Sequence, residues 1–543
     1  MKRYYKKSMW AIAAVVLLGA SACTKNFEVY NQDNTGINPD DLKGDYNDLG
    51  ALMTAQRSII NFSGGGDPNS YQLQQNLNAD CYSGYFMSPT PFNGGQNNLS
   101  YSLMNGWNGE PFKVGMLNIM GSVNRLRNTN VNEEFPAVWA VAQIVKVTGI
   151  SRVTDIYGPI PYSKVGTSKT SIAYDSQEDI YKSFFLELDT ATANLRNQIN
   201  GVTPALPFAF SRFDLVYDGD FTRWLQYANS LRLRLAMHIV KAAPELAKEQ
   251  AEKALDPANG GVITTNDGAM RVKVSGSGFS NPLVFIATNW ADIRIGASIV
   301  SYMNGYQDPR MSRYFDRSTD TTFPVRYQGI RIGSVGGSVT KNDYVTYSNL
   351  NVSGATPSFT LTTPVQIMTA AEVYFLRAEA ALRGWANAGG SVQTLYEQGI
   401  NVSMQQWGVN AGTYITDNTR VPEAFTDPKN SANNAPSPSA VTVRWDDAAT
   451  QAVKMERIIT QKWIAMFPEG QEAWTEYRRT GYPKLFPVVN NFSGGVISST
   501  TQIRRLPFTQ NEYQTNAAEV QQAITLLKGP DNGATRLWWD VAE

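Results

Sequence analysis

The chain has 543 residues, with 47 basic and 47 acidic side chains and therefore no formal net charge. Its length allows about three domains or one large body, and it has no block of like charge that would mark a nucleic-acid-binding protein. One histidine and two cysteines are few ligands for a soft-metal site and allow at most one disulfide. We therefore exclude zinc enzymes and disulfide scaffolds, and expect no metal, no cofactor and no nucleic-acid partner.

The first residues form a targeting segment. A cationic start, with Lys2 and Arg3, precedes an apolar stretch at 10–20, which is shorter than the ~20 residues of a membrane span. The sequence Ala-Ser-Ala-Cys ending at Cys23 resembles a bacterial lipobox, whose cysteine is acylated. We predict a lipoprotein signal peptide at 1–22 and a polar, lipid-anchored tether at 23–42. The alternative is an ordinary cleaved signal peptide that leaves Cys23 free to oxidise.

Helical patterns dominate the remaining body, residues 43–543. Apolar side chains spaced three and four residues apart predict helices at 43–61, 70–86, 107–128, 133–157, 176–199, 220–243, 366–386, 391–407, 454–467 and 510–527. Several of these form short-linked pairs, which typically stack into solenoid-like arrays. The ~34-residue self-similarity of tetratricopeptide repeats is absent, so any such relationship is degenerate.

Two stretches of the body, 257–364 and 408–447, are rich in Gly, Ser, Thr and Asn. Short runs at 270–274 and 326–332 favour strands. Long irregular segments in a compact body carry function or disorder, so we expect the binding surface among them. The predicted fold is mainly α: helix pairs at about 43–256 and 365–527 form a superhelical scaffold, with a loop-rich subdomain and a few short strands.

Motifs of common enzyme classes do not occur in the sequence. It has no Gly-x-Ser-x-Gly elbow, His-Glu-x-x-His helix, Gly-x-x-x-x-Gly-Lys loop or Gly-x-Gly-x-x-Gly fingerprint. Ser338 and Lys341 fit Ser-x-x-Lys by coincidence, because the accompanying elements of that class are missing. His238 lies in an apolar helical run, which favours a packed, hydrogen-bonded histidine over a catalytic base. We predict that the protein is not an enzyme; a surface glycosidase with paired carboxylates is the remaining enzymatic alternative.

A series of motifs runs through the mature chain in a fixed order. They are TDIYGPIPYS (154–163), DPR (308–310), the helix 368–385, the segment 396–407, QKWIAMF (461–467), EAW (472–474), YRRTGYP (477–483), RRLP (504–507) and WWD (538–540). In this order they resemble the SusD/RagB-type, or SusD-like, nutrient-binding outer-membrane lipoproteins of Bacteroidetes. The resemblance covers nearly the whole mature chain.

The motif residues themselves favour structural roles. We expect Trp463 and Trp474 to fill the core and Arg478 and Arg479 to hold loops or carboxylates through forked hydrogen bonds. The resemblance implies a lipid-anchored protein at the outer membrane, facing the cell exterior. It also implies a lid on a SusC-like, TonB-dependent transporter, to which the protein delivers oligosaccharides or other nutrients. One departure is that Glu28 is the only acid close behind Cys23, whereas surface-exported lipoproteins of these bacteria carry clustered acids.

Aromatic residues beside polar loop residues predict the ligand site, because sugar rings pack on aromatic faces and their hydroxyls need polar partners. Two regions show this pattern, 80–107 and 288–294. The predicted ligand-binding residues are Tyr82, Tyr85, Phe86, Trp107, Asn289, Trp290 and Asp292. For the aromatic members of the first region, helix packing is the competing interpretation. The ligand stays open between a glycan, our first choice, and a peptide or other metabolite; pure scaffolding of the transporter is a further alternative.

Overall fold

The computed structural model of the protein describes residues 45–61, 68–168, 171–274 and 278–542. The chain divides into residues 1–50 and residues 51–543, and the fold presented below is that of the second unit. The predicted signal peptide, tether and anchor residue Cys23 lie outside the described residues. Within these residues, no helix combines the length and the apolar character that crossing a membrane requires.

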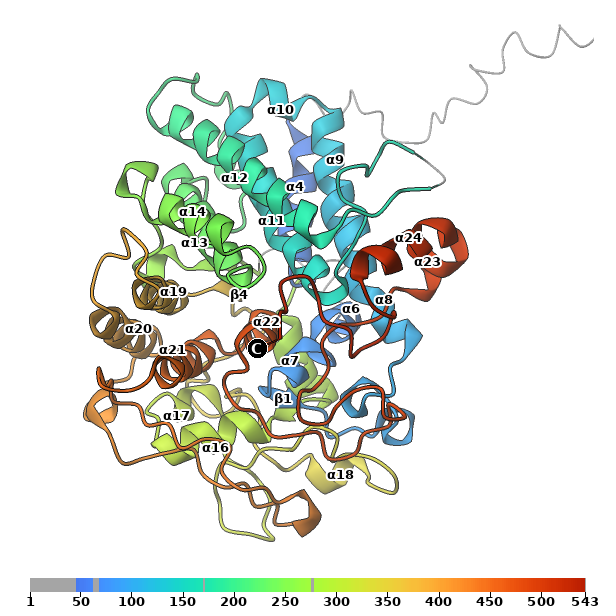
Figure 1. Cartoon of the computed structure of the whole chain (residues 1–543), viewed down its shortest axis with the longest axis vertical. Helices are drawn as coiled ribbons and strands as arrows, with labels where there is room; N and C mark the ends of the chain where they lie inside the picture. Colours follow the sequence, from blue (N-terminus) through green and yellow to red (C-terminus); the bar gives the residue numbers. More distant parts are fainter. Residues whose placement is uncertain (1–44, 62–67, 169–170, 275–277, 543) are drawn as a thin grey trace, which may run out of the picture. The chain divides into compact units, whose positions relative to one another are not determined.

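The body is mainly helical, as the sequence predicts (Figure 1). The helices of eight or more residues are α4 (Gly50–Ser58), α8 (Asn105–Lys113), α9 (Gly121–Asn128), α11 (Pro136–Tyr157), α12 (Gln177–Ile199), α13 (Phe221–His238), α14 (Pro244–Leu255), α16 (Ala297–Tyr306), α19 (Ala370–Leu382), α20 (Val392–Gln406), α21 (Gln451–Met466), α22 (Gly470–Thr480) and α24 (Ala517–Leu527). Shorter helices are α6 (Pro68–Tyr71), α7 (Ala79–Tyr82), α10 (Val131–Glu134), α15 (Pro282–Phe285), α17 (Met311–Tyr314), α18 (Lys341–Tyr344) and α23 (Gln510–Thr515). Three π-helical segments are η2 (Gln72–Asn76), η5 (Val114–Met120) and η9 (Ile286–Trp290).

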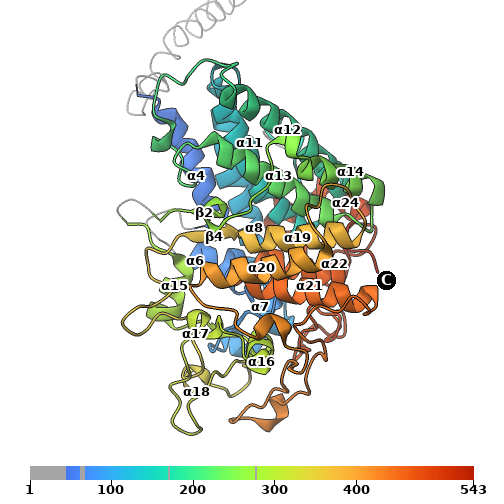
Figure 2. The same ribbon diagram turned by 90° about the vertical axis from the view of Figure 1, so that its left-hand side faces the viewer.

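The long helices pack as antiparallel neighbours in chain order. Helix α11 packs on α12, α12 on α13 and α13 on α14; α13 also contacts α19, which packs on α20 and α21. Figure 2 shows α19, α20 and α21 stacked below this first group. Side-chain caps begin many of these helices, as at Ser176, Asp220, Thr369, Ser391 and Thr450. The stack is the tetratricopeptide-like arrangement that the helix pairs predict.

In the part of the chain that the structure describes, two small antiparallel sheets connect segments that are distant in the sequence. Strand β1 (Phe86–Met87) pairs with β3 (Arg294–Ile295), and β2 (Met270–Val272) pairs with β4 (Val365–Met368). The first pair holds the two predicted ligand regions side by side. The strand predicted at 326–332 is wrong, because that segment contributes only a single bridge, between Ile330 and Gly296.

Several helices differ from the prediction. The helix expected at 70–86 is divided into α6, η2 and α7, because Asn78 has a non-helical backbone (φ −127°, ψ −101°). Helices α14, α16 and α22 are not predicted at all. Residues of α16 are mostly buried and many are poor helix formers, so packing decides their conformation. Every residue of the strongly polar helix α22 is buried.

A buried ion network explains how the polar helix α22 lies in the core. Arg479 donates to both oxygens of Glu379 at 2.8 and 2.7 Å, and to both oxygens of Glu476 at 3.0 and 2.7 Å. All three side chains are about 1% exposed. The network thereby joins α19 and α22, and the prediction that Arg479 holds carboxylates is confirmed.

The same network continues to the only histidine of the chain. Arg234 binds Glu372 through two hydrogen bonds of 2.7 Å, and His238 Nε2 lies 3.0 Å from Glu472 Oε1. His238 Nδ1 faces Tyr181 Oη at 2.9 Å and Asp155 Oδ2 at 3.3 Å. His238 is therefore a packed, hydrogen-bonded residue, as its helix predicts.

Three members of the network, His238, Glu472 and Glu476, offer potential metal-ligand atoms within 4.8 Å of one another. Their charges are already balanced by protein groups, because Lys462 Nζ lies 3.8 Å from Glu472 and 3.4 Å from Glu476. Arg234 adds a second cation at 3.7 Å from Glu472. The arrangement is that of an internal ion network.

Candidate functional site

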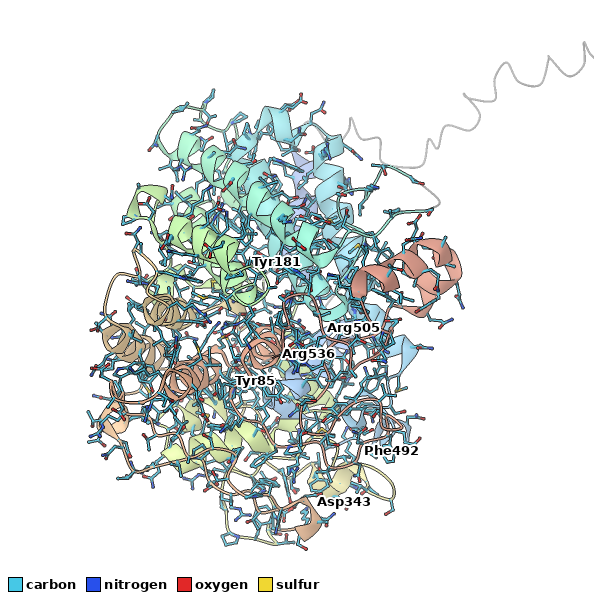
Figure 3. All side chains as sticks on the ribbon, in the orientation of Figure 1. Tyr85, Tyr181, Asp343, Phe492, Arg505 and Arg536 are labelled. Atoms are coloured by element: carbon cyan, nitrogen blue, oxygen red, sulfur yellow. The ribbon has the colours of Figure 1, made fainter. Side chains whose placement is uncertain are left out.

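Three of the predicted ligand contacts belong to the core. Tyr82 and Tyr85 are 0% exposed and Phe86 is 1% exposed. The ring of Tyr82 packs against Trp474 at 5.2 Å, and that of Tyr85 against Trp463 at 5.3 Å. Figure 3 shows Tyr85 among the side chains that pack the interior. The prediction that these three residues contact ligand is wrong because their rings are enclosed; Trp463 and Trp474 are core residues, as predicted.

The other predicted aromatic of the first region reaches the surface. Trp107 lies in the first turn of α8 and is half-buried. Its ring packs edge-on against Phe92 at 5.4 Å and 82°. Phe92 is also half-buried and begins the turn at Phe92–Gly95. The two rings thus leave part of their apolar area open to solvent.

The second region ends a π-helical segment. Trp290 is the last residue of η9, and Ala291 then takes a left-handed backbone conformation (φ 51°). The Trp290 ring is half-buried and packs edge-on against Phe285 at 5.8 Å. Asn289 beside it is exposed, and its oxygen accepts a hydrogen bond from Thr288 at 2.9 Å. Single-turn π segments are frequent at functional sites.

Asp292, which follows Trp290 closely, connects its own segment to those of Thr90 and Lys341. Its Oδ1 accepts hydrogen bonds from Thr90 Oγ1 at 2.6 Å and from Lys341 Nζ at 2.7 Å. Lys341 also donates to the backbone oxygen of Trp290. Together with the β1–β3 pair, these contacts bring the two predicted regions to one place. We call the set Phe92, Trp107, Asn289, Trp290 and Asp292 the aromatic surface.

Two basic side chains, Arg294 and Lys341, lie near the Asp292 carboxylate of the aromatic surface. Burial lowers the pKa of Arg294 to about 10, with the nearby Asp292 carboxylate opposing the shift. Its guanidinium stays charged at neutral pH and donates to the backbone oxygens of Val345 at 2.7 Å and Ile293 at 2.6 Å. Arg294 and Lys341 thus place two cations beside one carboxylate. Open ring faces next to hydrogen-bonding groups can hold a polar ligand that has an apolar face.

The sequence places Phe92 inside the first predicted region but not among the predicted ligand contacts, and it predicts no ligand contact at Thr90 or Lys341. Lys341 and Asp292 are separated by 49 residues, and Thr90 and Asp292 by 202. No periodic pattern connects positions so far apart. In the sequence, the feature that marks Phe92 as a candidate ligand contact is its position next to the polar, glycine-rich stretch 93–98.

A close backbone approach fixes the loop that carries Phe92. Gly95 has φ 86°, and a Cβ there would lie 2.2 Å from Gly336 Cα. We expect Gly95→Ala to lower the free energy of unfolding by at least about 2 kcal/mol more than Gly94→Ala, because the loop at 333–337 must move. Gly94 also has positive φ (65°) but has open space around its Cβ position, so it controls for backbone strain. Urea denaturation measures both, and equal losses would contradict the steric argument.

Comparison with known proteins identifies the family. The family model "SusD-like: Susd and RagB outer membrane lipoprotein" matches residues 29–540. A chitin-binding SusD homologue from Flavobacterium johnsoniae is 44% identical, with a TM-score of 0.85, over 92% of this chain and 99% of that one. A SusD homologue from Bacteroides vulgatus is 36% identical, with a TM-score of 0.85, over 93% and 99% of the two chains.

A SusD homologue from Bacteroides thetaiotaomicron is 35% identical, with a TM-score of 0.81, over 91% of this chain and 99% of that chain. Among curated proteins, no significant match was found. The family match covers most of the chain, and the three similar structures cover 91–93% of it. The chain therefore belongs to the SusD-like family of SusD and RagB outer-membrane lipoproteins.

Proposed function

We propose that this protein is a surface-exposed glycan-binding lipoprotein. In this proposal residues 1–22 are removed, Cys23 is acylated, and the body from residue 43 forms a lid on a SusC-like, TonB-dependent transporter that receives the ligand. Family membership supports the anchor and the transporter partner. The 44% identity to a chitin-binding homologue supports a glycan as ligand.

The observation that carries the proposal is the aromatic surface. Trp107 and Trp290 come from two distant segments, yet the β1–β3 pair and the Asp292 contacts hold these segments together. Pyranose rings present C–H faces that pack on such rings, while their hydroxyls need hydrogen-bonding partners. Asn289 and Lys341 provide such partners beside the rings.

We expect Trp107→Ala and Trp290→Ala each to weaken oligosaccharide binding by about ten-fold, or ~1.4 kcal/mol. Each substitution removes an apolar face on which a sugar ring packs. Calorimetry on the intact protein in detergent, with chitin oligosaccharides first and then other glycans, measures the loss. Trp385→Ala is the matched control, because Trp385 is also half-buried but lies beyond the end of α19, against Arg383.

The same samples discriminate between the alternatives. Unchanged affinity in both variants would mean that the aromatic surface is not the glycan site. Chromatography after each titration detects cleavage, and degraded ligand would favour a surface glycosidase. If calorimetry shows saturable binding of short peptides but of no glycan, the protein is a peptide binder. No saturable heat with any ligand, together with stable co-purification of a barrel, would favour a scaffold.

A further inference from the structure

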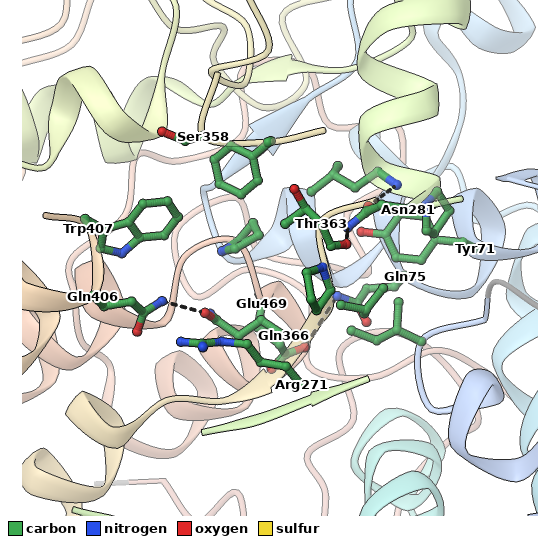
Figure 4. Close-up of a pocket in the computed structure, with 17 residues that line it drawn as sticks. Tyr71, Gln75, Arg271, Asn281, Ser358, Thr363, Gln366, Gln406, Trp407 and Glu469 are labelled. Carbon is green, nitrogen blue, oxygen red and sulfur yellow. Dashed lines mark hydrogen bonds between the residues drawn. The ribbon is translucent and has the colours of Figure 1, made fainter. Parts of the chain in front are cut away.

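A cavity of about 250 Å³ is lined in part by Pro282 and Leu283 of α15. It is lined by residues of β2, β4, α15, the end of α20 and the segment before α22 (Figure 4). Its volume is smaller than the ~300–1,000 Å³ of sites for drug-sized ligands, so it suits a single small ring. None of the residues of the aromatic surface lines it.

One wall of the cavity is apolar and carries two aromatic rings that are tilted by 47° to each other. Trp407 is half-buried, and its ring lies 5.4 Å from that of Phe359. Three prolines, Pro282, Pro364 and Pro468, extend the apolar lining. Such a wall packs against the face of a ring, as aromatic side chains do in other small-molecule sites.

Arg271 gives the cavity a cation that lacks an ion-pair partner among the described residues. The side-chain hydrogen bond of its guanidinium runs from Nη1 to Asn266 O at a long 3.5 Å. The register of β2 against β4 shifts between Met270 and Arg271, and such irregularities re-aim side chains and occur near active sites. Burial lowers the pKa of Arg271, while Tyr217 and Asp267 oppose the shift. Arg234 and Arg479, in contrast, are each paired with buried carboxylates.

The one acid that lines the cavity is already compensated. Glu469 forms an ion pair with Arg152 at 2.9 Å and accepts hydrogen bonds from the backbone N–H groups of Gln471 and Glu472. A ligand with an ammonium group would therefore find no free carboxylate here. An anionic group on the ligand, in contrast, meets the guanidinium of Arg271, which favours a fork of two hydrogen bonds to a carboxylate.

Amide groups complete the lining. Gln406 Nε2 donates to Gln366 Oε1 at 2.9 Å, and Gln366 in turn donates to Met466 O at 3.0 Å. Gln406 Oε1 is buried and has no hydrogen-bond donor among the described residues. Buried acceptors of this kind are rare without a partner. A ligand that carries hydroxyl groups next to its carboxylate would supply such donors.

We propose that this cavity binds a sugar acid, with the pyranose face on Trp407 and the carboxylate on Arg271. The site is separate from the aromatic surface and does not depend on the proposed glycan function there. The apolar wall packs against the sugar ring, Arg271 binds the carboxylate, and Gln366 and Gln406 hydrogen-bond to the hydroxyl groups. A neutral hexose lacks the group that Arg271 recognises.

Calorimetry of the intact protein with glucuronate, galacturonate and glucose tests the proposal. We expect saturable binding of at least one uronate, and binding of glucose at least about ten-fold weaker. Arg271→Gln should weaken uronate binding by about ten-fold or more while leaving glucose unchanged, and Trp407→Leu should weaken it as well. Arg271→Lys, which keeps the charge but loses the fork, should retain partial affinity.

Trp290→Ala is the matched control for location, because it alters the aromatic surface and should leave uronate binding unchanged. Thermal melting and circular dichroism establish that each variant is folded. No saturable binding of either uronate to the folded protein would overturn the proposal, as would uronate binding that Arg271→Gln leaves intact. Loss of uronate binding in Trp290→Ala would also overturn it and would assign the acid to the aromatic surface.

Discussion

Replacing Arg479 with Met is expected to lower the free energy of unfolding by about 3–5 kcal/mol. Its guanidinium is about 1% exposed and binds both Glu379 and Glu476. Without it, Glu379 and Glu476 lose the buried guanidinium that pairs with both of them. The Arg479 charge holds the pKa of Glu379 well below its usual range, although burial alone would raise that pKa. Urea denaturation followed by circular dichroism measures the loss.

Arg383 provides the matched control, because it donates to the same Glu379 oxygen at 2.8 Å while its own side chain is 26% exposed. Arg383→Met should cost no more than about 1 kcal/mol. Adding Glu379→Gln to Arg479→Met should recover part of the loss, since one unpaired charge is then removed. Equal losses for the two arginine variants would show that burial of the network does not set its energy.

The second large expected effect is a dependence of the free energy of unfolding on pH, through His238. The carboxylates of Glu472 and Asp155 raise the pKa of His238 to about 9, against the opposing effect of burial. Protonated His238 therefore favours the folded state. Its stabilising contribution is complete below pH 6.5, which is the ordinary pKa of histidine. The contribution is lost as the pH rises toward about 9, the pKa in the folded protein. The shift corresponds to at most about 3 kcal/mol.

His238→Gln tests this contribution, because groups that His238 does not contact titrate identically in both proteins and cancel in the difference, while the pKa of Glu472, which His238 lowers, changes with it. The glutamine side chain can still hydrogen-bond to Tyr181 or Glu472, but it does not titrate. We expect the stability difference between the two proteins to be large at pH 6 and to shrink steadily up to pH 10. A difference that stays constant over this range would mean that His238 has the same pKa in the folded and unfolded chain.

The sequence predicts most long helices, because apolar residues at helical spacing produce an amphipathic pattern whatever the partner is. It does not predict α22, whose pattern of charged residues is typical of an exposed surface. Helix α22 is buried because Glu379 on α19 and His238 on α13 meet its ionic side chains. These partners lie 100 and 234 residues away. Long-range charge pairing of this kind leaves no periodic signal.

In the candidate site, too, the sequence predicts some features, while others depend on long-range packing partners. Trp107 lies in the first turn of α8, Trp290 ends η9 and Asp292 follows it, and the sequence locates the two regions that carry them. Tyr82 and Tyr85 have similar polar, glycine-containing neighbours, yet they face Trp474 and Trp463 in the interior. Local composition therefore identifies loops rich in aromatic residues, and only the packing partners decide which rings are exposed.

The β1–β3 pair has a consequence for how the molecule can change. It fastens residues 86–87 to residues 294–295, which are the stems of the loop that begins at Ser88 and of the segment that carries Trp290. Insertions or deletions beyond these stems alter the shape of the loops while their points of attachment stay in place. Ligand preference can thus diverge through changes at the exposed positions 93–94 and 288–289, without altering the helical stack that keeps the protein folded.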